Sequence, residues 1–237
     1  AGRYVQRAIH LDQPARLVIA RDEPNNRWVI LELFHHLIDD RTTLELVQQE
    51  VTAILNGRGP QLAAPVPFRD FVARTRLGVS REAHEAYFRE LLGDVDEPTA
   101  PFGLTDVFND GTEIAEINWA LDPALCARLR VCARAAEVSP ATLCHLAWAQ
   151  VLARASGRDD VVFGTVLLGR MYAGAAHGMG LYINTLPIRI RIGADSVREG
   201  VYRTHSLLTD LLHHEHAPLN LTQRCSAVRP PLPLFSS

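Results

Sequence analysis

The chain has 237 residues, of which 47% are hydrophobic and 22% are charged, and its formal net charge is −3. These values are ordinary for a globular protein of one large domain or two small ones. The small net charge and the absence of a long basic run argue against binding to nucleic acid or to an anionic membrane surface. No apolar stretch approaches the ~20 residues that cross a bilayer, and the first residues do not follow a signal-peptide pattern.

Four cysteines lie far apart and form no Cys-x-x-Cys pair: Cys126, Cys132, Cys144 and Cys225. Three of them fall in segments with a helical pattern, where a free cysteine behaves as a small buried apolar residue. We therefore expect neither disulfides nor a zinc site, and a reducing compartment such as the cytoplasm.

Two apolar runs near the start, residues 17–20 and 28–34, read as strands, and the polar residues 22–26 between them read as a turn. Together they predict a β-hairpin. Apolar residues then recur at helical spacing from 44 to 55, and Gly57 ends that helix.

Residues 56–67 are rich in Gly, Pro and Ala and are typical of an extended linker. Two short helices are predicted after it, over 68–77 and 80–92, with Ser80 as the N-cap of the second. Residues 93–111 contain Asp, Pro and Gly without a periodic pattern, which indicates a crossover between two lobes.

The second half alternates strands and helices. Residues 115–121 alternate as one face of a strand and place Trp119 on a predicted core face. Trp148 lies on the predicted core face of the helix that begins at Ser139-Pro140. Helices begin at Asp122-Pro123 and Ser139-Pro140. The rest reads as a strand over 161–168 suited to a sheet covered on both faces, a loop over 171–180, a strand over 182–192, a helix over 196–214 and an extended tail over 229–233. The alternation predicts an α/β or α+β fold.

A pair of histidines, His35 and His36, directly follows the apolar run 28–34, and Asp40 comes four residues after the second histidine. Imidazole takes and returns a proton near neutral pH, and a strand end is a rigid place to present a base. The carboxylate can lock the local backbone or orient an imidazole. A His-His-x-x-x-Asp pattern between a strand and a helix points to acyl transfer.

Several segments together resemble the condensation domain of nonribosomal peptide synthetases, a family of the chloramphenicol acetyltransferase-like superfamily. Residues 35–40 are similar to its His-His-x-x-x-Asp-Gly signature, and residues 180–189 resemble its Gly-x-Phe-x-Asn-Thr segment. Further likeness lies in 139–143, 156–165, 216–219 and 233–236. The two signatures are specific jointly, and the likeness covers nearly the whole chain.

The resemblance implies a two-layer α/β sandwich and parts of two lobes of a V-shaped pseudo-dimer around a tunnel. Family members are roughly twice this length, so we expect a partial domain. Residues 1–93 would be the C-terminal part of the first lobe, 94–111 the crossover and 112–237 the first part of the second lobe. A lobe that lacks strands exposes sheet edges and apolar surface, so we expect self-association, poor solubility or a complementing chain.

Roles for individual residues follow from the same resemblance. His36 would contact the attacking amine, either as a general base or by holding the amine and stabilising a zwitterionic intermediate. His35 would be structural, since neighbours on a strand point to opposite faces. Asp40 would be a structural anion paired with an arginine, for which Arg170 is the candidate.

Asn184 would hydrogen-bond a substrate or fix a contact between lobes, and Gly180 and Tyr182 are the other expected substrate-binding residues. The implied reaction is amide formation between two thioester substrates, in the synthesis of secondary metabolites such as antibiotics. The two thioester substrates would be attached to the phosphopantetheine arms of donor and acceptor peptidyl carrier proteins. No cofactor would be bound directly, and the neighbours would be other synthetase domains. The main tasks are then positioning and the handling of one proton.

Departures from the family leave alternatives. Arg41 stands where the family has glycine, which permits a positive φ, so either the loop differs or the position does not need it. The segment 41–45 lacks the tryptophan typical of the epimerisation branch, and the heterocyclising branch replaces the histidines. Condensation is therefore favoured. A discrete acyltransferase using acyl-coenzyme A and a non-catalytic docking module are the other readings. His213 and His216 have helical spacing, yet we expect a polar helix end there and no metal.

Overall fold

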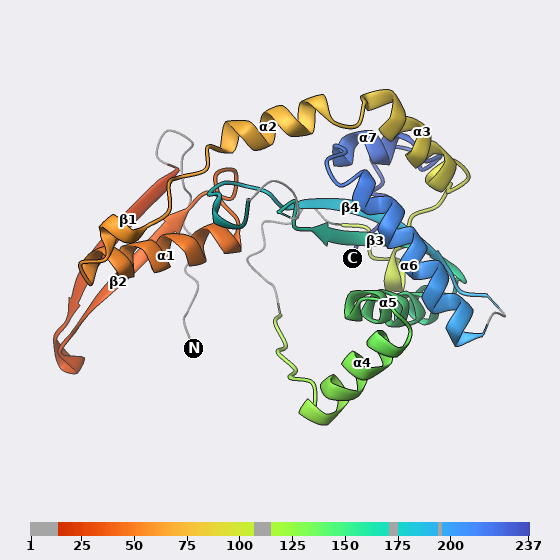
Figure 1. Ribbon diagram of the computed structural model, residues 1–237. Coiled ribbons are helices and arrows are strands. Elements are labelled where there is room, and N and C mark those ends of the chain that lie inside the picture. The colour runs from red at the N-terminus through yellow and green to blue at the C-terminus, as the bar shows by residue number, and fades with distance from the viewer. Residues whose placement is uncertain (1–13, 107–114, 171–174, 194–195) are drawn as a thin grey trace. The chain divides into compact units, whose positions relative to one another are not determined.

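The computed structural model describes residues 14–106, 115–170, 175–193 and 196–237 (Figure 1). The chain divides into two compact units. We call residues 1–76 and 168–183 the hairpin unit, and residues 77–167 and 184–237 the sheet unit. These units divide at other places than the expected lobes, 1–93 and 112–237; that lobe assignment concerns a larger fold and stays a prediction.

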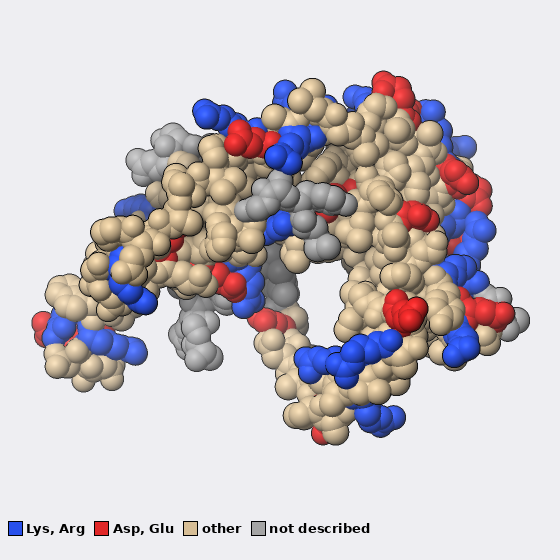
Figure 2. All heavy atoms as spheres, in the orientation of Figure 1, with Lys and Arg blue, Asp and Glu red and all other residues tan. Residues whose placement is uncertain are grey.

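The hairpin unit begins with strands β1 (Ala15–Asp22) and β2 (Arg27–Phe34), which pair antiparallel with Ile19 opposite Ile30. The predicted hairpin is thus confirmed. Its turn is the short helix η1 (Glu23–Asn25), closed by an ion pair of 2.7 Å between Arg27 Nε and Asp22 Oδ2. Figure 2 shows the charged side chains gathered at this turn.

The apolar side chains of the hairpin lie mostly in solvent. Leu17 and Ile19 are each 62% exposed, Trp28 is 66% exposed and Ile30 is 56% exposed, whereas Leu33 near the histidines is buried. The hairpin therefore contributes to a core only at the end that carries His35 and His36. An apolar sheet face with this exposure is typical of a surface that associates, and the self-association expected from the sequence stays a prediction.

Helix α1 (Arg41–Leu55) follows the histidines and begins earlier than predicted, because Asp40 accepts a hydrogen bond from the Thr43 N–H and caps it. The linker 56–67 contains only the short helix η2 (Gly59–Gln61), and α2 (Phe68–Leu77) follows it. The hairpin unit is completed by residues 168–183, which include η4 (Ala175–His177).

The sheet unit is built on strands β3 (Asp160–Leu167) and β4 (Asn184–Arg191), which pair antiparallel with Phe163 opposite Ile188. Val161, Val162 and Phe163 are successive residues that point to both faces, and each is at most 2% exposed. The prediction of a strand covered on both faces is therefore confirmed.

Helices α3 to α7 and one short helix, η3, surround this pair of strands. They are α3 (Arg81–Leu92), η3 (Pro101–Gly103), α4 (Pro123–Ala135), α5 (Pro140–Ser156), α6 (Val197–His213) and α7 (Leu219–Arg224). The predicted caps Ser80, Asp122 and Ser139 each accept backbone hydrogen bonds at a helix start. The core between strands and helices includes Phe88, Leu92, Leu152, Leu186, Ile188 and Leu211.

One buried cation is fixed by two carboxylates in this unit. Arg189 on β4 is 7% exposed and bonds both Asp160 and Asp94. The hydrogen bond from Arg189 lowers the pKa of Asp94 to about 2. Because a buried guanidinium is tolerated only when it is paired, this group ties β4 to the segment after α3.

Residues 115–121 do not form the predicted strand and have no regular structure. Ile117 and Trp119 are 88% and 86% exposed, so Trp119 is not a core residue. Alternation makes a strand only where a partner strand supplies hydrogen bonds, and no described strand pairs with this segment. The prediction for Trp148 was also wrong, because its side chain is nearly half exposed.

All four cysteines are free thiols. Only Cys225 is buried, while Cys132 and Cys144 are exposed, so helix position did not place them in the core as expected. Within the described residues, no helix has the length and apolar character needed to span a bilayer.

Candidate functional site

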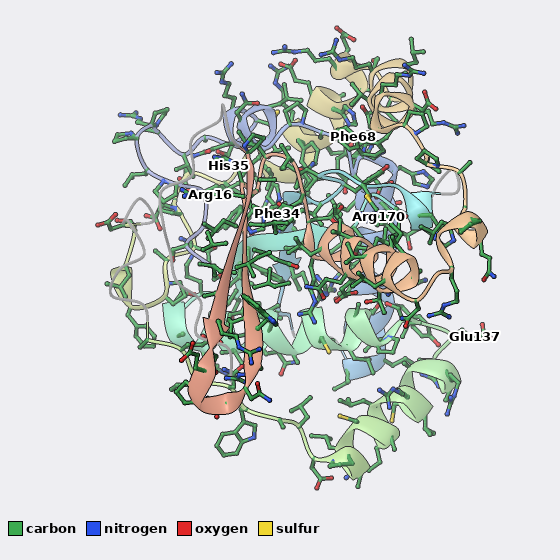
Figure 3. The ribbon with its side chains drawn as sticks, turned by 90° about the vertical axis from the view of Figure 1, so that its left-hand side faces the viewer. Arg16, Phe34, His35, Phe68, Glu137 and Arg170 are labelled. Atoms are coloured by element: carbon green, nitrogen blue, oxygen red, sulfur yellow. The ribbon has the colours of Figure 1, made fainter. Side chains whose placement is uncertain are left out.

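The two histidines lie in a tight turn directly after β2. The His35 N–H donates to Pro14 O at 2.8 Å, and the Ile38 N–H donates to His35 O at 2.9 Å. Nδ1 of His35 accepts from the Leu37 N–H at 3.1 Å. Figure 3 shows His35 at the end of the hairpin opposite its turn. The backbone therefore holds His35 and leaves its Nδ1 as an acceptor.

His36 differs from His35 in accessibility: its side chain is exposed, whereas that of His35 is half-buried. The reason differs from the expected strand alternation, because β2 ends at Phe34 and His36 lies within the turn. The turn thus presents one imidazole to solvent and ties the other to the backbone.

Asp40 is the most heavily bonded residue of the motif, with 1% of its surface exposed. Its carboxylate accepts from the Thr43 N–H at 2.9 Å, the Tyr182 N–H at 3.1 Å and Arg170 Nη2 at 2.7 Å. Burial alone raises the pKa of Asp40, but the bonds from Arg170 and the two amides outweigh it, so the pKa lies below its ordinary value. The carboxylate therefore stays ionised and closes the loop between β2 and α1.

Arg170 is the partner that the sequence proposed for Asp40, and its side chain is 9% exposed. Nη1 donates to Gly178 O at 2.6 Å, and Nη2 also reaches Thr43 Oγ1 at 3.0 Å. The guanidinium lies 4.1 Å from the centre of the Tyr182 ring. A buried ion pair is stable only when its remaining donors are satisfied, and these contacts do that in part. Figure 3 labels Arg170 beside α1.

Gly180 is held against the same helix start. Thr43 Oγ1 donates to Gly180 O at 2.8 Å and accepts from Gly180 N at 3.0 Å. The φ of Gly180 is +147°, and a Cβ atom there would lie 2.3 Å from Cδ2 of Phe68. Only glycine fits both the backbone angle and the ring contact.

Tyr182 is 2% exposed and packs among aromatic rings, with centroid distances of 5.2 Å to Phe68 and 4.5 Å to Phe71. Its hydroxyl is buried, and it has no hydrogen-bond partner among the described residues. In this structure Tyr182 supports Arg170 by packing, and its expected contact with substrate stays a prediction.

Asn184 belongs to the sheet unit. Its Nδ2 donates to Glu215 O and Ala217 O, both at 2.8 Å. Both amide hydrogens are thus used by the chain itself, so a substrate would have to bind through Oδ1.

Three residues of the site were not singled out from the sequence: Thr43, Phe68 and Asp39. Thr43 is the third residue of a capped helix, a position where a bonded amide could be foreseen. Asp39 is 3% exposed, and burial raises its pKa, which the nearby His36 and His35 oppose. Nothing in the sequence marks Phe68, whose contact depends on the fold.

Arg41, which replaces the family glycine, is the first residue of α1. The positive φ angles of described residues other than glycine occur at Asn26, Phe102 and Glu137, so Arg41 is unstrained. Its exposed side chain pairs with Glu45 at 2.9 Å. The position therefore does not need glycine for its backbone.

Among the described residues, no group of three or more His, Cys, Asp or Glu side chains is placed to hold a metal ion. The turn after β2 presents one exposed imidazole, that of His36, and the buried Asp40–Arg170 pair fixes the residues that follow it. This arrangement suits proton handling and the positioning of a substrate.

Comparison with known proteins identifies the class. Residues 5–235 match the condensation-domain family, so the chain belongs to that family. It is 52% identical over 224 residues to malpinin synthetase of Mortierella alpina and 48% identical over 224 residues to malpibaldin synthetase of the same organism. The match covers 94% of this chain but only 3% and 4% of those proteins.

Solved structures show the same fold. The condensation domain of the Monacolin K polyketide synthase MokA has a TM-score of 0.71 and 22% identity, covering 98% of this chain and 57% of that one. The first condensation domain of the calcium-dependent antibiotic synthetase, with a substrate analogue, has a TM-score of 0.70 and 22% identity, covering 93% of this chain and 50% of that one. The chain therefore has the chloramphenicol acetyltransferase-like fold of condensation domains and spans about half of each.

Proposed function

We propose that this chain carries the catalytic motif of a condensation domain that joins a donor acyl thioester to the amine of an acceptor aminoacyl thioester. The observation that carries the proposal is the turn 35–38, which exposes His36 and is followed two residues later by Asp40 in its buried pair with Arg170. Membership of the family and the 52% identity to a segment of malpinin synthetase support it.

The reaction needs positioning more than activation, because a thioester is already a reactive acyl donor. The acceptor amine attacks the donor carbonyl, a C–N bond forms, the C–S bond breaks and the donor arm leaves as a thiol. One proton must leave the amine, and His36 is the exposed group suited to take it or to hold the amine. Asp40 and Arg170 act as positioning residues, since their bonds fix the loop that begins at His36.

The substrates of this reaction would be presented on phosphopantetheine arms of donor and acceptor carrier proteins, with no cofactor bound by the chain itself. Neighbouring synthetase domains would be its physical partners. The match to much longer relatives, of whose length it covers only a few per cent, supports this. We also propose a cytoplasmic location, supported by four cysteines that are free thiols.

The test is amide formation by the full protein that carries this chain, with donor and acceptor loaded on carrier proteins and the acceptor followed by intact mass. Product from the carrier-bound pair, with little from free acyl-coenzyme A, is the expected result. Efficient turnover of free acyl-coenzyme A would identify a discrete acyltransferase. No product, with carrier binding intact and insensitive to His36→Ala, would identify a docking module.

A further inference from the structure

Two imidazoles meet inside the sheet unit, away from the motif histidines. His84 on α3 is 5% exposed, and His214 directly follows α6. Their Nδ1 atoms are 3.0 Å apart, and the ring centroids are 5.1 Å apart in an edge-on arrangement. This distance is a hydrogen bond, so one Nδ1 must donate and the other must accept.

The contact tolerates at most one extra proton. Two neutral rings satisfy it when one carries its hydrogen on Nδ1, and a single imidazolium can donate to a neutral partner. When both rings are protonated, both Nδ1 atoms are donors and the contact is lost. The pair therefore responds to acid by separating, as two like charges at this distance would in any case.

His84 is buried, His214 is half-buried, and aromatic rings pack against the pair. The His214 ring stacks on Tyr87 at 4.1 Å with an interplanar angle of 10°, and Phe88 lies edge-on at 6.1 Å. Burial lowers the pKa of both His84 and His214. The other titratable or charged groups around them are Glu85, Tyr87 and Glu90 of α3, Asp210 and His213 of α6, Glu215 and His216 before α7, and Cys225 after it. Arg189 and Arg191 at the end of β4 and Arg203 of α6 line the same cavity as His214.

His214 also begins the short segment that binds Asn184. The Ala217 N–H donates to His214 O at 2.9 Å, which closes a turn over residues 214–217. Glu215 O and Ala217 O in this turn are the two acceptors of Asn184 Nδ2. The position of the His214 ring and the position of the Asn184 amide are thus set by the same four residues.

We propose that the His84–His214 contact is a proton-sensitive clasp that holds the turn 214–217 and, through it, the side chain of Asn184. His84 and His214 are then positioning residues for Asn184. Their effect on catalysis rests on the proposed function, in which Asn184 serves the substrate, but the coupling within the sheet unit does not.

The sign of the response follows from the geometry. The folded pair favours neutral rings, so acid favours conformations in which the rings separate. Burial lowers the pKa of both rings, and only the second proton breaks the contact. The clasp is therefore closed at and above the ordinary histidine pKa of about 6.5, and it opens as the pH falls through the lowered pKa values of the folded pair. The Asn184 amide loses its fixed acceptors over the same range.

The experiment is an NMR titration of the full chain from about pH 8 to about pH 5. It follows the ring signals of His84 and His214 and the side-chain NH₂ signals of Asn184. In the wild type we expect the Asn184 signals to move with the midpoint of the pair. In His84→Asn, whose amide can still hydrogen-bond His214 but does not titrate, the Asn184 response should be lost while the fold is kept. His84→Leu should release Asn184 at every pH.

His213→Asn is the matched control, because His213 is exposed, adjacent and outside the contact. In this variant the Asn184 signals should respond to pH as they do in the wild type. The clasp is overturned if the Asn184 signals stay fixed while the two histidines titrate, or if they respond equally in His84→Asn. Neither of these NMR results bears on the amide-forming assay. If condensation is absent while Asn184 still responds to the histidine pair, only the proposed function is contradicted.

Discussion

Asp40 combines two structural tasks that are usually separate. It caps α1 through the Thr43 amide and neutralises Arg170, while the Tyr182 amide uses its second oxygen. A cap depends on neighbours within a turn, so a local pattern could have revealed it, but the apolar periodicity placed the start of this helix later, at residue 44. Local pattern could not reveal the bonds to Arg170 and Tyr182, which lie 130 and 142 positions away; the Arg170 pairing was expected only through the family resemblance.

Replacing this carboxylate tests its role as a brace. Asp40→Asn can keep the cap but leaves the Arg170 guanidinium buried without its counter-charge, so we expect a loss of about 3 kcal/mol in the hairpin unit. Faster hydrogen exchange of the Thr43 and Tyr182 amides would measure it. Glu45→Gln removes an exposed partner of Arg41 and should leave these amides unchanged. Equal hydrogen-exchange protection of these amides in the wild type and in Asp40→Asn would show that the Asp40 carboxylate does not stabilise this loop.

Gly180 gives a second test at a single residue. Gly180→Ala places a Cβ 2.3 Å from Phe68 in a backbone angle that favours glycine, so we expect a loss of about 1–3 kcal/mol in urea unfolding. Gly59→Ala, where the nearest atom is 3.6 Å away and φ is not positive, is the matched control. A neutral Gly180→Ala would mean that Phe68 does not lie against this backbone.

At the scale of elements, the helices and the strand β3 could be predicted because their signals are local: a capping residue, a 3.6-residue period or a continuous apolar run. The strand expected over 115–121 could not be judged in this way, since a strand exists only with its partner. The same reason explains Trp119. Its alternating neighbours predicted a core position, but its side chain is exposed.

The β1–β2 hairpin leads to a prediction of self-association. Ile19 and Ile30, which lie opposite each other on the two strands, are exposed, and so are Leu17 and Trp28. Exposed apolar strands tend to associate with other chains. Sedimentation velocity should show oligomers that dissociate in the double variant Ile19→Lys, Ile30→Lys. Leu55→Lys, at an 82% exposed position of α1, should not change the distribution. A wild-type monomer at high concentration would contradict this prediction.

The group around Arg189 predicts the acid response of the sheet unit. Its hydrogen bonds lower the pKa of Asp94 to about 2, and the Arg189 and Arg191 bonds also outweigh burial and lower the pKa of Asp160. A carboxyl with a lowered pKa stabilises the fold above its ordinary pKa, and this contribution is lost as the pH falls toward the folded value. Unfolding followed by circular dichroism should therefore show a falling stability from about pH 4 to about pH 2.

Arg189→Met tests whether the acid response of the sheet unit comes from the ion pairs of Arg189. It should be less stable at neutral pH and should show a smaller slope between about pH 4 and about pH 2. A slope equal to that of the wild type would assign the acid response to other carboxyls.

At the scale of the whole molecule, the family signature is divided between distant parts of the chain. Asp40 and Thr43 bind Arg170, Gly180 and Tyr182 within the hairpin unit. Asn184, two positions after Tyr182, is bound within the sheet unit. Sequence resemblance assigned these residues to one function. The division between units, the burial of Tyr182 and the use of the Asn184 amide by the turn 214–217 required the structure.

The proposed function assigns acyl transfer to His36, which the turn after β2 exposes, while the backbone holds His35. The most direct measurement is the single-turnover rate of amide formation between carrier-bound substrates in the full protein, for the wild type, His36→Ala and His35→Ala. We expect His36→Ala to lose about 10²–10⁴-fold, as for removal of a general base, with carrier binding and fold unchanged. His35→Ala should lose far less once its stability is matched. Equal rates for His36→Ala and the wild type would show that His36 has no part in amide formation.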